Sequence, residues 1–280
     1  MISVALCTYN GEKFIEEQLN SILKQTLAVD EIVICDDNST DSTLEILNKY
    51  KEKDNRIKLY KNKKNLGTIK CFEKAILLTG GEIIFLSDQD DIWKADKVER
   101  MNAFFQDNQH CSMLFTNGIL IDENNNSLGS TLWEKWGFDD LIKQKWINNN
   151  NAFLDLIRNK NKVTGATVAF NARLKNEFIP INTPQGYWHD TWLAMHAAYR
   201  NSLFFLDECT ILYRTHQNQQ IGINTKTLHV DKFNITVRKF KRIIRKKFPE
   251  FATDIDIIPE EKKLYLRLIH KIKRILNIKF

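Results

Sequence analysis

Residues 83–93 read IIFLSDQDDIW. The apolar run and its closing serine predict a buried strand, and the carboxylates of Asp88, Asp90 and Asp91 follow it within four positions. Carboxylates this close together repel one another, which costs stability unless a positive group lies among them. The stretch leaves two interpretations open: an acidic turn that water screens, or a site that a cation completes.

This strand is the fourth in an alternation of short apolar runs with helical patterns. Strands are predicted at 2–7, 31–37, 57–61 and 83–87, and helices at 14–25, 39–51, 68–79 and 96–108. The alternation is typical of an α/β fold, in which a largely parallel sheet carries helices on both faces. Beyond residue 110 we expect a strand pair at 112–121, a strand at 163–171, a helix at 189–200 and two short strands at 204–216.

Polar residues follow three of the first four strands: TYN at 8–10, DDNSTD at 36–41 and DQDD at 88–91. In open α/β sheets ligands bind beyond the carboxyl ends of the strands, so the three clusters are expected to share one site. Clustered carboxylate oxygens suit Mg²⁺ or Mn²⁺ far better than zinc. A metal with a bound diphosphate would complete the charge balance of such a cluster.

The composition is that of a globular protein with a sizeable core. Of 280 residues, 43% are hydrophobic, which excludes disorder as the main state. The cysteines are odd in number, scattered and without a CxxC pair: Cys7, Cys35, Cys71, Cys111 and Cys209. We therefore expect neither a disulfide framework nor a zinc site, and we expect the protein to be in the reducing cytosol. The sequence has no apolar stretch long enough for a transmembrane helix and no basic start typical of a signal peptide.

The positive charge is concentrated at the C-terminal end. Residues 229–280 contain 15 Lys and Arg against 6 Asp and Glu, a net of +9, which leaves 26 against 29 for the rest of the chain. Apolar residues at helical spacing run through this segment. It fits either a helix docked on the body with a solvated basic face, or a helix lying on an anionic membrane, where each Lys or Arg contributes about 1 kcal/mol. No nucleic-acid-binding signature accompanies the charge.

Together these motifs resemble the family 2 glycosyltransferases, which have a GT-A fold, a Rossmann-like and mostly parallel sheet flanked by helices. The bacterial members that build surface polysaccharides are the most similar, and DQDDIW is most like the rhamnosyltransferase branch. The resemblance covers residues 1–225, with a nucleotide-binding half at 1–110 and an acceptor half at 111–225, and leaves 226–280 as a basic amphipathic helical tail. Its marks are CTYN, DDNSTD, NLGT, SDQDDIW, TGATVAF, HD and YRTH.

The resemblance implies roles for particular residues. Contacts to the nucleotide sugar are implied for Cys7, Thr8, Tyr9, Asp36, Asp37, Asn65, Gly67, Asp88, Asp90 and Arg214. Ligation of Mn²⁺ or Mg²⁺ is implied for Asp88, Asp90, Asp91 and His216, with the choice among the three carboxylates left open. Asp190 matches the catalytic base of an inverting transfer, and contacts to the acceptor are implied for Gly165, His189 and Trp192. Asp37 and Asp190 also suit a helix-capping role.

The implied reaction is transfer from a nucleoside diphosphate sugar, dTDP-rhamnose or a UDP-hexose, to a hydroxyl of a growing lipid-linked glycan. The implied location is the cytoplasmic face of the cell membrane, with peripheral contact to anionic lipid and no nucleic acid. One alternative is a haloacid-dehalogenase-like phosphatase with Asp88 as nucleophile and Asp90 as acid, although Ile92 and the fourth-strand position fit it poorly. Another is a non-catalytic nucleotide-sugar-binding protein. The sugar, the acceptor and the oligomeric state stay open.

Overall fold

The computed structural model describes residues 1–149, 152–158, 161–217, 219 and 236–253. The strands are β1 (Ile2–Thr8), β2 (Glu31–Asp36), β3 (Ile57–Lys61), β4 (Ile83–Ser87), β5 (Ile92–Trp93), β6 (Met113–Ile121), β7 (Ser127–Thr131), β8 (Val168–Asn171) and β9 (Leu203–Arg214). The α-helices are α1 (Ile15–Leu23), α2 (Thr43–Lys53), α3 (Thr68–Leu78), α4 (Lys97–Asp107), α5 (Leu132–Trp136), α6 (Asp140–Asn149), α7 (Ala152–Ile157), α8 (Lys175–Phe178), α9 (His189–Tyr199) and α10 (Val237–Lys247). Short 3₁₀ helices are η1 (Gly165–Thr167), η2 (Ala172–Leu174) and η3 (Pro249–Phe251).

The strands form one mixed sheet in the order β3-β2-β1-β4-β8-β6-β9-β5, with β7 paired to β6. The first four strands in the sequence pair in parallel, with β1 between β2 and β4. Strand β8 then inserts antiparallel between β4 and β6. Because β1, β2 and β4 run in the same direction, the polar segments that follow them emerge at one edge of the sheet.

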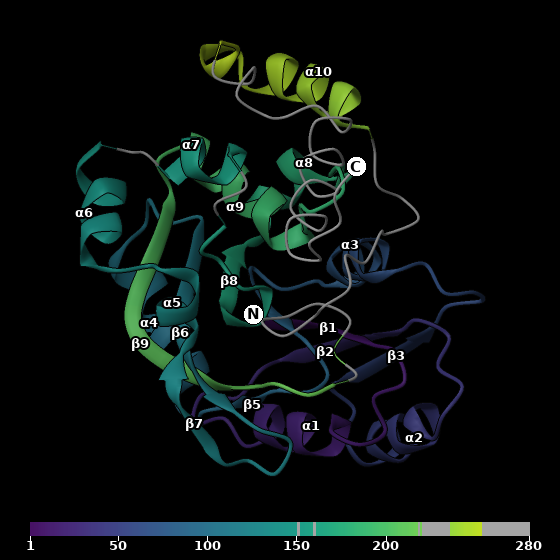
Figure 1. Ribbon diagram of the computed structural model, residues 1–280. Coiled ribbons are helices and arrows are strands. Elements are labelled where there is room, and N and C mark those ends of the chain that lie inside the picture. The colour runs from purple at the N-terminus through teal and green to yellow at the C-terminus, as the bar shows by residue number, and fades with distance from the viewer. Residues whose placement is uncertain (150–151, 159–160, 218, 220–235, 254–280) are drawn as a thin grey trace, which may run out of the picture.

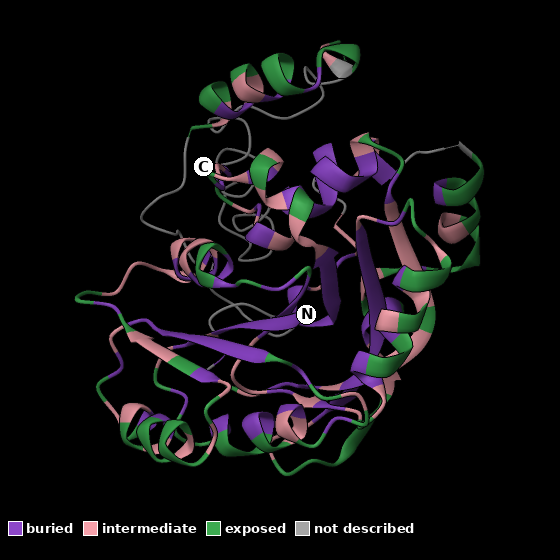
Figure 2. Ribbon diagram, turned by 180° about the vertical axis from the view of Figure 1, so that it is seen from behind, coloured by how far each residue is buried: buried purple, intermediate pink, exposed green. Residues whose placement is uncertain are grey.

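Helices cover both faces of the sheet. Helices α1 and α2 lie on one face, and α3 and α9 lie on the other, with α10 outermost (Figure 1). Strands β1, β2 and β4 are buried between them, the edge strand β3 is partly exposed, and the outward sides of α1 and α2 are exposed (Figure 2). Residues such as Val4, Leu6, Ile34 and Leu86 have no exposed surface, which explains the continuous apolar runs of these strands.

The predicted elements of the first half of the chain are confirmed, and three of those in the second half are corrected. The strand expected at 163–171 is the 3₁₀ helix η1 followed by the shorter strand β8. The strand pair expected at 112–121 is the single strand β6, and the two strands expected at 204–216 are the single strand β9. These two strands pair in parallel, and the register shifts around Asn117 and Gly118. Asn117 Oδ1 accepts hydrogen bonds from the backbone N–H groups of Gly118 and Trp133. Asn117 and Gly118 therefore form an irregularity within strand β6 and not a turn between two strands.

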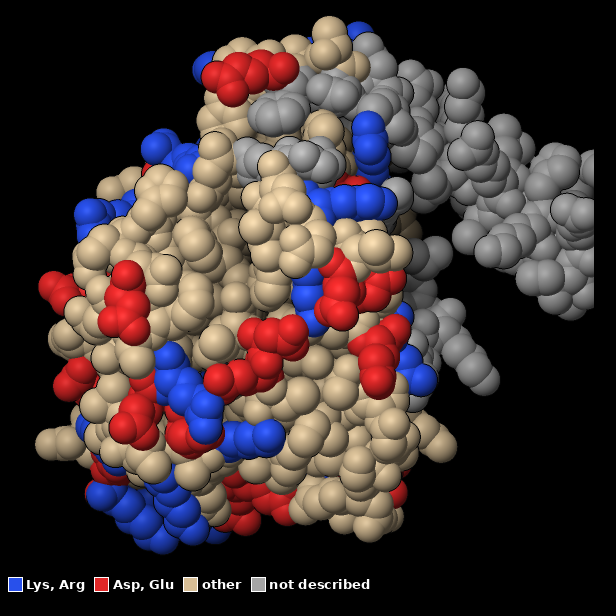
Figure 3. Space-filling view, turned by 90° about the vertical axis from the view of Figure 1, so that its left-hand side faces the viewer, with Lys and Arg blue, Asp and Glu red and all other residues tan. Residues whose placement is uncertain are grey.

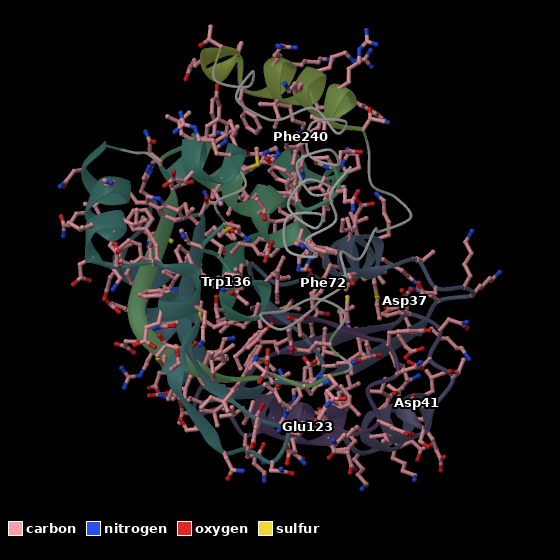
Figure 4. All side chains as sticks on the ribbon, viewed as in Figure 1. Asp37, Asp41, Phe72, Glu123, Trp136 and Phe240 are labelled. Atoms are coloured by element: carbon pink, nitrogen blue, oxygen red, sulfur yellow. The ribbon has the colours of Figure 1, made fainter. Side chains whose placement is uncertain are left out.

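Helix α10 docks on the body of the protein. Its buried face carries Phe240 and Ile244, and the Phe240 ring lies 5.1 Å from that of Tyr187 and 6.1 Å from that of Trp192 (Figure 4). The docked interpretation therefore holds for this part of the basic segment. The rest of the predicted tail, 226–235 and 254–280, lies outside the described residues. Within the described part of the chain, no helix is long and apolar enough to cross a bilayer.

Candidate active site

The ends of β1, β2 and β4 are tied together by side chains. Thr8 Oγ1 donates to Asp36 Oδ2 (2.9 Å), which joins β1 to β2. The Gln89 side chain accepts from the Tyr9 N–H (2.7 Å) and donates to the Tyr9 carbonyl (3.1 Å), which joins β1 to the acidic loop after β4. The three polar clusters thus form one assembly, as predicted.

Asp36 is a structural member of this assembly. It has no exposed surface, and it accepts from Thr8 and from the Ser39 N–H (2.9 Å). The predicted contact of Asp36 with the nucleotide is therefore corrected, because its carboxylate is enclosed by protein donors.

Asp37 organises the loop that precedes α3. Its carboxylate accepts from Asn62 Nδ2 (2.8 Å) and from the N–H groups of Leu66 (2.7 Å) and Gly67 (2.8 Å). Gly67 has a φ of 82°, a conformation that favours glycine, and it is the N-cap residue of α3. Asn65 is partly exposed on this loop. The predicted contact of Asp37 with the nucleotide base stays a prediction.

The carboxylates after β4 have unequal environments. Asp88 and Asp90 are partly exposed, and Asp91 is fully buried. Burial, followed by the charges of Asp90 and Asp190, raises the pKa of Asp88 to about 7. Asp91 Oδ1 accepts from the Arg214 N–H (3.0 Å), whereas Oδ2 has no hydrogen-bond partner, and burial holds the pKa of Asp91 well above its usual range. Since Asp91 is enclosed, the predicted metal ligands reduce to Asp88, Asp90 and His216.

His216 lies directly against this cluster. Its Nε2 is 2.8 Å from Asp90 Oδ2, and its ring is 4.9 Å from that of Phe14. Within the described residues, no three His, Cys, Asp or Glu side chains are arranged to hold a metal ion by themselves. Two carboxylates with one imidazole nevertheless fit Mn²⁺ or Mg²⁺, which commonly take one or two protein carboxylates and complete their shell with substrate phosphates.

Arg214 contacts the acidic loop, residues 88–91, and holds it in position. Its side chain has no exposed surface, and its guanidinium lies 4.5 Å from the Phe14 ring centroid. Nε donates to the Asp90 carbonyl (2.7 Å), Nη2 pairs with Glu17 (2.5 Å), and Nη1 bonds to Asn125. These contacts favour positioning of the loop over the predicted direct contact with a diphosphate.

Asp190 lies in the first turn of α9. The N-cap residue of α9 is Trp188, so the capping alternative for Asp190 is wrong. Asp190 Oδ1 accepts from the Thr191 N–H (2.5 Å) and from Asn161 Nδ2 (3.3 Å). Burial raises the pKa of Asp190 to about 6, although hydrogen bonds from Thr191, Gly165 and Asn161 oppose the shift. The charge of Asp190 also contributes to the raised pKa of Asp88, as expected of carboxyls that lie near one another.

The predicted acceptor residues need correction. Trp192 is fully buried and donates to the Phe178 carbonyl (2.6 Å), so it belongs to the core. His189 is buried with neither ring nitrogen bonded, lies 4.1 Å from the Phe72 ring, and has its pKa lowered by burial to about 3. The space beside Gly165 is taken by His189 Nε2, which would lie 2.9 Å from a β-carbon at that position. The glycine therefore accommodates His189, the residue before Asp190.

A family model described as glycosyl transferase family 2 matches residues 3–174, which include β1 to β8 and the acidic loop. The chain belongs to glycosyltransferase family 2. An uncharacterized glycosyltransferase of Haemophilus influenzae is 27% identical to this glycosyltransferase over 99% of the chain and 83% of its own length. The putative teichuronic acid biosynthesis glycosyltransferase TuaG of Bacillus subtilis is 27% identical over 78% of this chain and 80% of its own length.

Solved structures show the GT-A fold of this glycosyltransferase. TarS 1–349 of S. aureus, in complex with UDP-GlcNAc, superposes with a TM-score of 0.62 at 22% identity, covering 88% of this chain and 65% of that one. The mannosyltransferase PcManGT of Pyrobaculum calidifontis, in complex with GDP-Man and Mn²⁺, superposes with a TM-score of 0.57 at 17% identity. The match covers 91% of this chain and 68% of that one. The predicted fold is confirmed, and the haloacid-dehalogenase alternative is removed.

Three residues of the glycosyltransferase site were missed by the sequence reasoning. Gln89 links β1 to the acidic loop, Asn161 donates to Asp190, and Lys97 is buried beneath the carboxylates. Gln89 lies between two predicted ligands, which was a usable signal. Asn161 and Lys97 lie in segments where one polar residue among several carries no distinguishing pattern.

Proposed function

We propose that this glycosyltransferase transfers a sugar from a nucleoside diphosphate sugar to a hydroxyl of a cell-surface glycan, with a divalent cation and with inversion at the anomeric carbon. The observation that carries the proposal is that Asp190 and the acidic loop meet at η1. Gly165 lies against the Asp190 side chain, and the Ala166 carbonyl accepts from Lys97 Nζ, which lies over Trp93 at the end of the acidic loop. One face of this site offers carboxylates for a cation, and the other offers a base whose pKa burial has raised to about 6.

Different residues have different roles in the proposed reaction. Asp88, Asp90 and His216 would hold Mn²⁺ or Mg²⁺, whose charge offsets that of the diphosphate leaving group. Asp190 accepts the proton of the attacking hydroxyl, because it is ionised above its pKa and still basic enough to take a proton. Thr191 and Asn161 orient its carboxylate through Oδ1. A single base opposite the leaving group makes one in-line displacement, so the anomeric configuration inverts.

The substrate class is proposed from the relatives. WfgD of Escherichia coli, named a UDP-Glc:alpha-D-GlcNAc-diphosphoundecaprenol beta-1,3-glucosyltransferase, is 34% identical over 46% of this chain and 49% of its own length. TarS is solved with UDP-GlcNAc. These names favour a UDP-hexose donor and a lipid-linked acceptor, while the DQDDIW resemblance keeps dTDP-rhamnose as the second donor to test.

A donor panel tests the proposal. Purified protein with Mn²⁺ and a polyprenyl-diphosphate sugar acceptor is expected to release nucleoside diphosphate from one donor among UDP-glucose, UDP-GlcNAc, UDP-galactose and dTDP-rhamnose. Release should stop in EDTA and return with added Mn²⁺. Donor binding without release, measured by calorimetry, would instead support the non-catalytic alternative.

The lipid-linked acceptor also calls for contact with a membrane, which we assign to the outward face of α10. Because the opposite face is docked through Phe240 and Ile244, the exposed cations point away from the core. The face towards α6 mixes both signs of charge (Figure 3). Each exposed Lys or Arg near an anionic leaflet is worth about 1 kcal/mol.

Neutralising the outward face of α10 is expected to weaken cosedimentation with phosphatidylglycerol vesicles at least tenfold. The variant carries Arg238→Gln, Arg242→Gln and Lys246→Gln, which leave the docked face intact. A matched control changes three exposed lysines of α2, Lys49, Lys51 and Lys53, to Gln, and should bind as the wild type does. Equal loss in both variants would show a general charge effect and contradict an assigned surface.

A further inference from the structure

Lys97 is a lysine with no exposed surface, at the first residue of α4. Lysine is rarely fully buried without compensation, because burial of its charge is costly. The start of a helix is also an unfavourable place for a cation, since the helix dipole is positive there. The position is therefore explained by what surrounds the ammonium and not by the helix.

Two contacts hold the ammonium in place. Lys97 Nζ donates to the Ala166 carbonyl (2.7 Å) and lies 4.0 Å from the Trp93 ring centroid. Burial lowers the pKa of Lys97 to about 7, and the charges of Asp91 and then Asp88 oppose this shift. The same two carboxyls have raised pKa values because of burial and mutual repulsion, which Lys97 opposes in return.

The hydrogen bond from Lys97 to Ala166 connects Lys97 with the segment next to Asp190. Ala166 is in η1, whose first residue, Gly165, lies against the side chain of Asp190: a β-carbon at Gly165 would be 3.8 Å from Asp190 Cβ. Gly165 also lies against His189, the residue before Asp190. The Lys97 ammonium thus interacts electrostatically with the carboxylates after β4. It also forms a hydrogen bond with η1, the segment that contacts Asp190.

We propose that Lys97 is a positioning residue which fixes the acidic loop relative to Asp190. Its ammonium lies over Trp93 at the end of that loop, compensates the charge of the buried Asp91, and holds η1 through the Ala166 carbonyl. The charge compensation is independent of the proposed function, whereas the effect on turnover rests on Asp190 being the base. Arg214 does not duplicate this role, because its guanidinium is directed to Glu17, Asn125 and the Asp90 carbonyl.

The charge compensation is tested by thermal unfolding of Lys97→Met, Asp91→Asn and the double variant. Lys97→Met keeps the length of the side chain and should lower Tm, since it leaves Asp91 without a nearby cation. Adding Asp91→Asn should restore at least half of that loss. Lys175→Met is the matched control, because Lys175 Nζ also donates to a backbone carbonyl, that of Thr79 (2.7 Å), away from the acidic loop. Asp91→Asn should restore nothing in that background, and additive losses in both backgrounds would overturn the proposal.

Positioning is tested by turnover per nucleotide-binding site, with the sites counted by calorimetric titration so that unfolded protein does not contribute. Lys97→Met should lower this turnover about 100-fold, and Lys175→Met should change it less than twofold. Unchanged turnover per site in Lys97→Met would overturn the positioning role. If the wild type itself transfers no sugar, the proposed function fails, and the unfolding cycle still decides the charge compensation.

Discussion

Asp190→Asn is expected to lower sugar transfer by about 10³-fold or more while binding of the nucleoside diphosphate stays within about threefold. The magnitude follows from the contribution of a well-placed general base, about 10²–10⁴-fold. Asn keeps the shape of the side chain and can still accept from Thr191 through its carbonyl oxygen. The loss should therefore appear in kcat, measured with saturating donor and acceptor.

The pKa of Asp190 adds a second signature. Because the base must be ionised, the wild-type kcat/KM should rise with pH up to about 6 and then level off. Folding raises this pKa above its unfolded value, so ionisation of Asp190 destabilises the folded state as pH rises through about 6. Asp190→Asn should accordingly leave Tm at pH 7.5 unchanged or higher. Asp140→Asn, a first-turn carboxylate of α6 that is exposed, is the matched control and should retain full activity.

Wild-type turnover in Asp190→Asn would remove Asp190 as the base. A parallel loss of nucleotide binding would show that the carboxylate shapes the donor site instead.

Asp90→Ala is expected to abolish metal-dependent transfer, with a loss of about 10³-fold, because it removes one of two carboxylates open to a cation and the partner of His216. Mn²⁺ binding, followed by the electron paramagnetic resonance signal of free Mn²⁺ in the presence of nucleoside diphosphate, should weaken in parallel. Burial raises the pKa of Asp88 to about 7, so protons compete with the metal and Mn²⁺ affinity of the wild type should increase between pH 6 and 8.

Asp107→Ala provides the control for Asp90→Ala, since Asp107 is an exposed carboxylate at the end of α4. It should bind Mn²⁺ and transfer sugar as the wild type does. Retention of Mn²⁺ binding and activity in Asp90→Ala would contradict the metal site.

The first half of the fold could be predicted because each element there carries its own local signal. Apolar runs such as 83–87 and 31–36 are short, bounded by polar residues and separated by helical patterns, so strand and helix are distinguished by period alone. The shared direction of these strands then brings their polar ends to one edge. That step correctly placed Thr8, Asp37, Asp88 and Asp90 together.

The second half could not be read in the same way, because its strands are defined by long-range pairing. Strand β8 inserts between β4 and β6, and β9 follows β6 across a register shift at Asn117. Local patterns do not encode such partners, so irregularities within β6 and β9 look the same in sequence as breaks between strands.

Within the site, sequence identified the acidic residues better than their orientation. Asp91 differs little from Asp90 in sequence, yet Asp91 is enclosed and accepts from the Arg214 backbone. Asp36 and Asp37 are both buried and accept from protein donors, although sequence alone suits either of them to a ligand. The resemblance implied a contact of Trp192 with the acceptor, and Trp192 lies two positions beyond Asp190. Two positions along a helix turn a side chain by about 200°, and this rotation directs Trp192 into the core.

The anomeric configuration of the product is the most direct test of the account. Transfer from the donor that the panel identifies should be followed by ¹H NMR of the newly formed glycosidic bond. With Asp190 as the base in a single displacement, an α-linked UDP-hexose should give only the β-glycoside, and a β-linked donor only the α-glycoside. A product that keeps the configuration of the donor would contradict single displacement at this site.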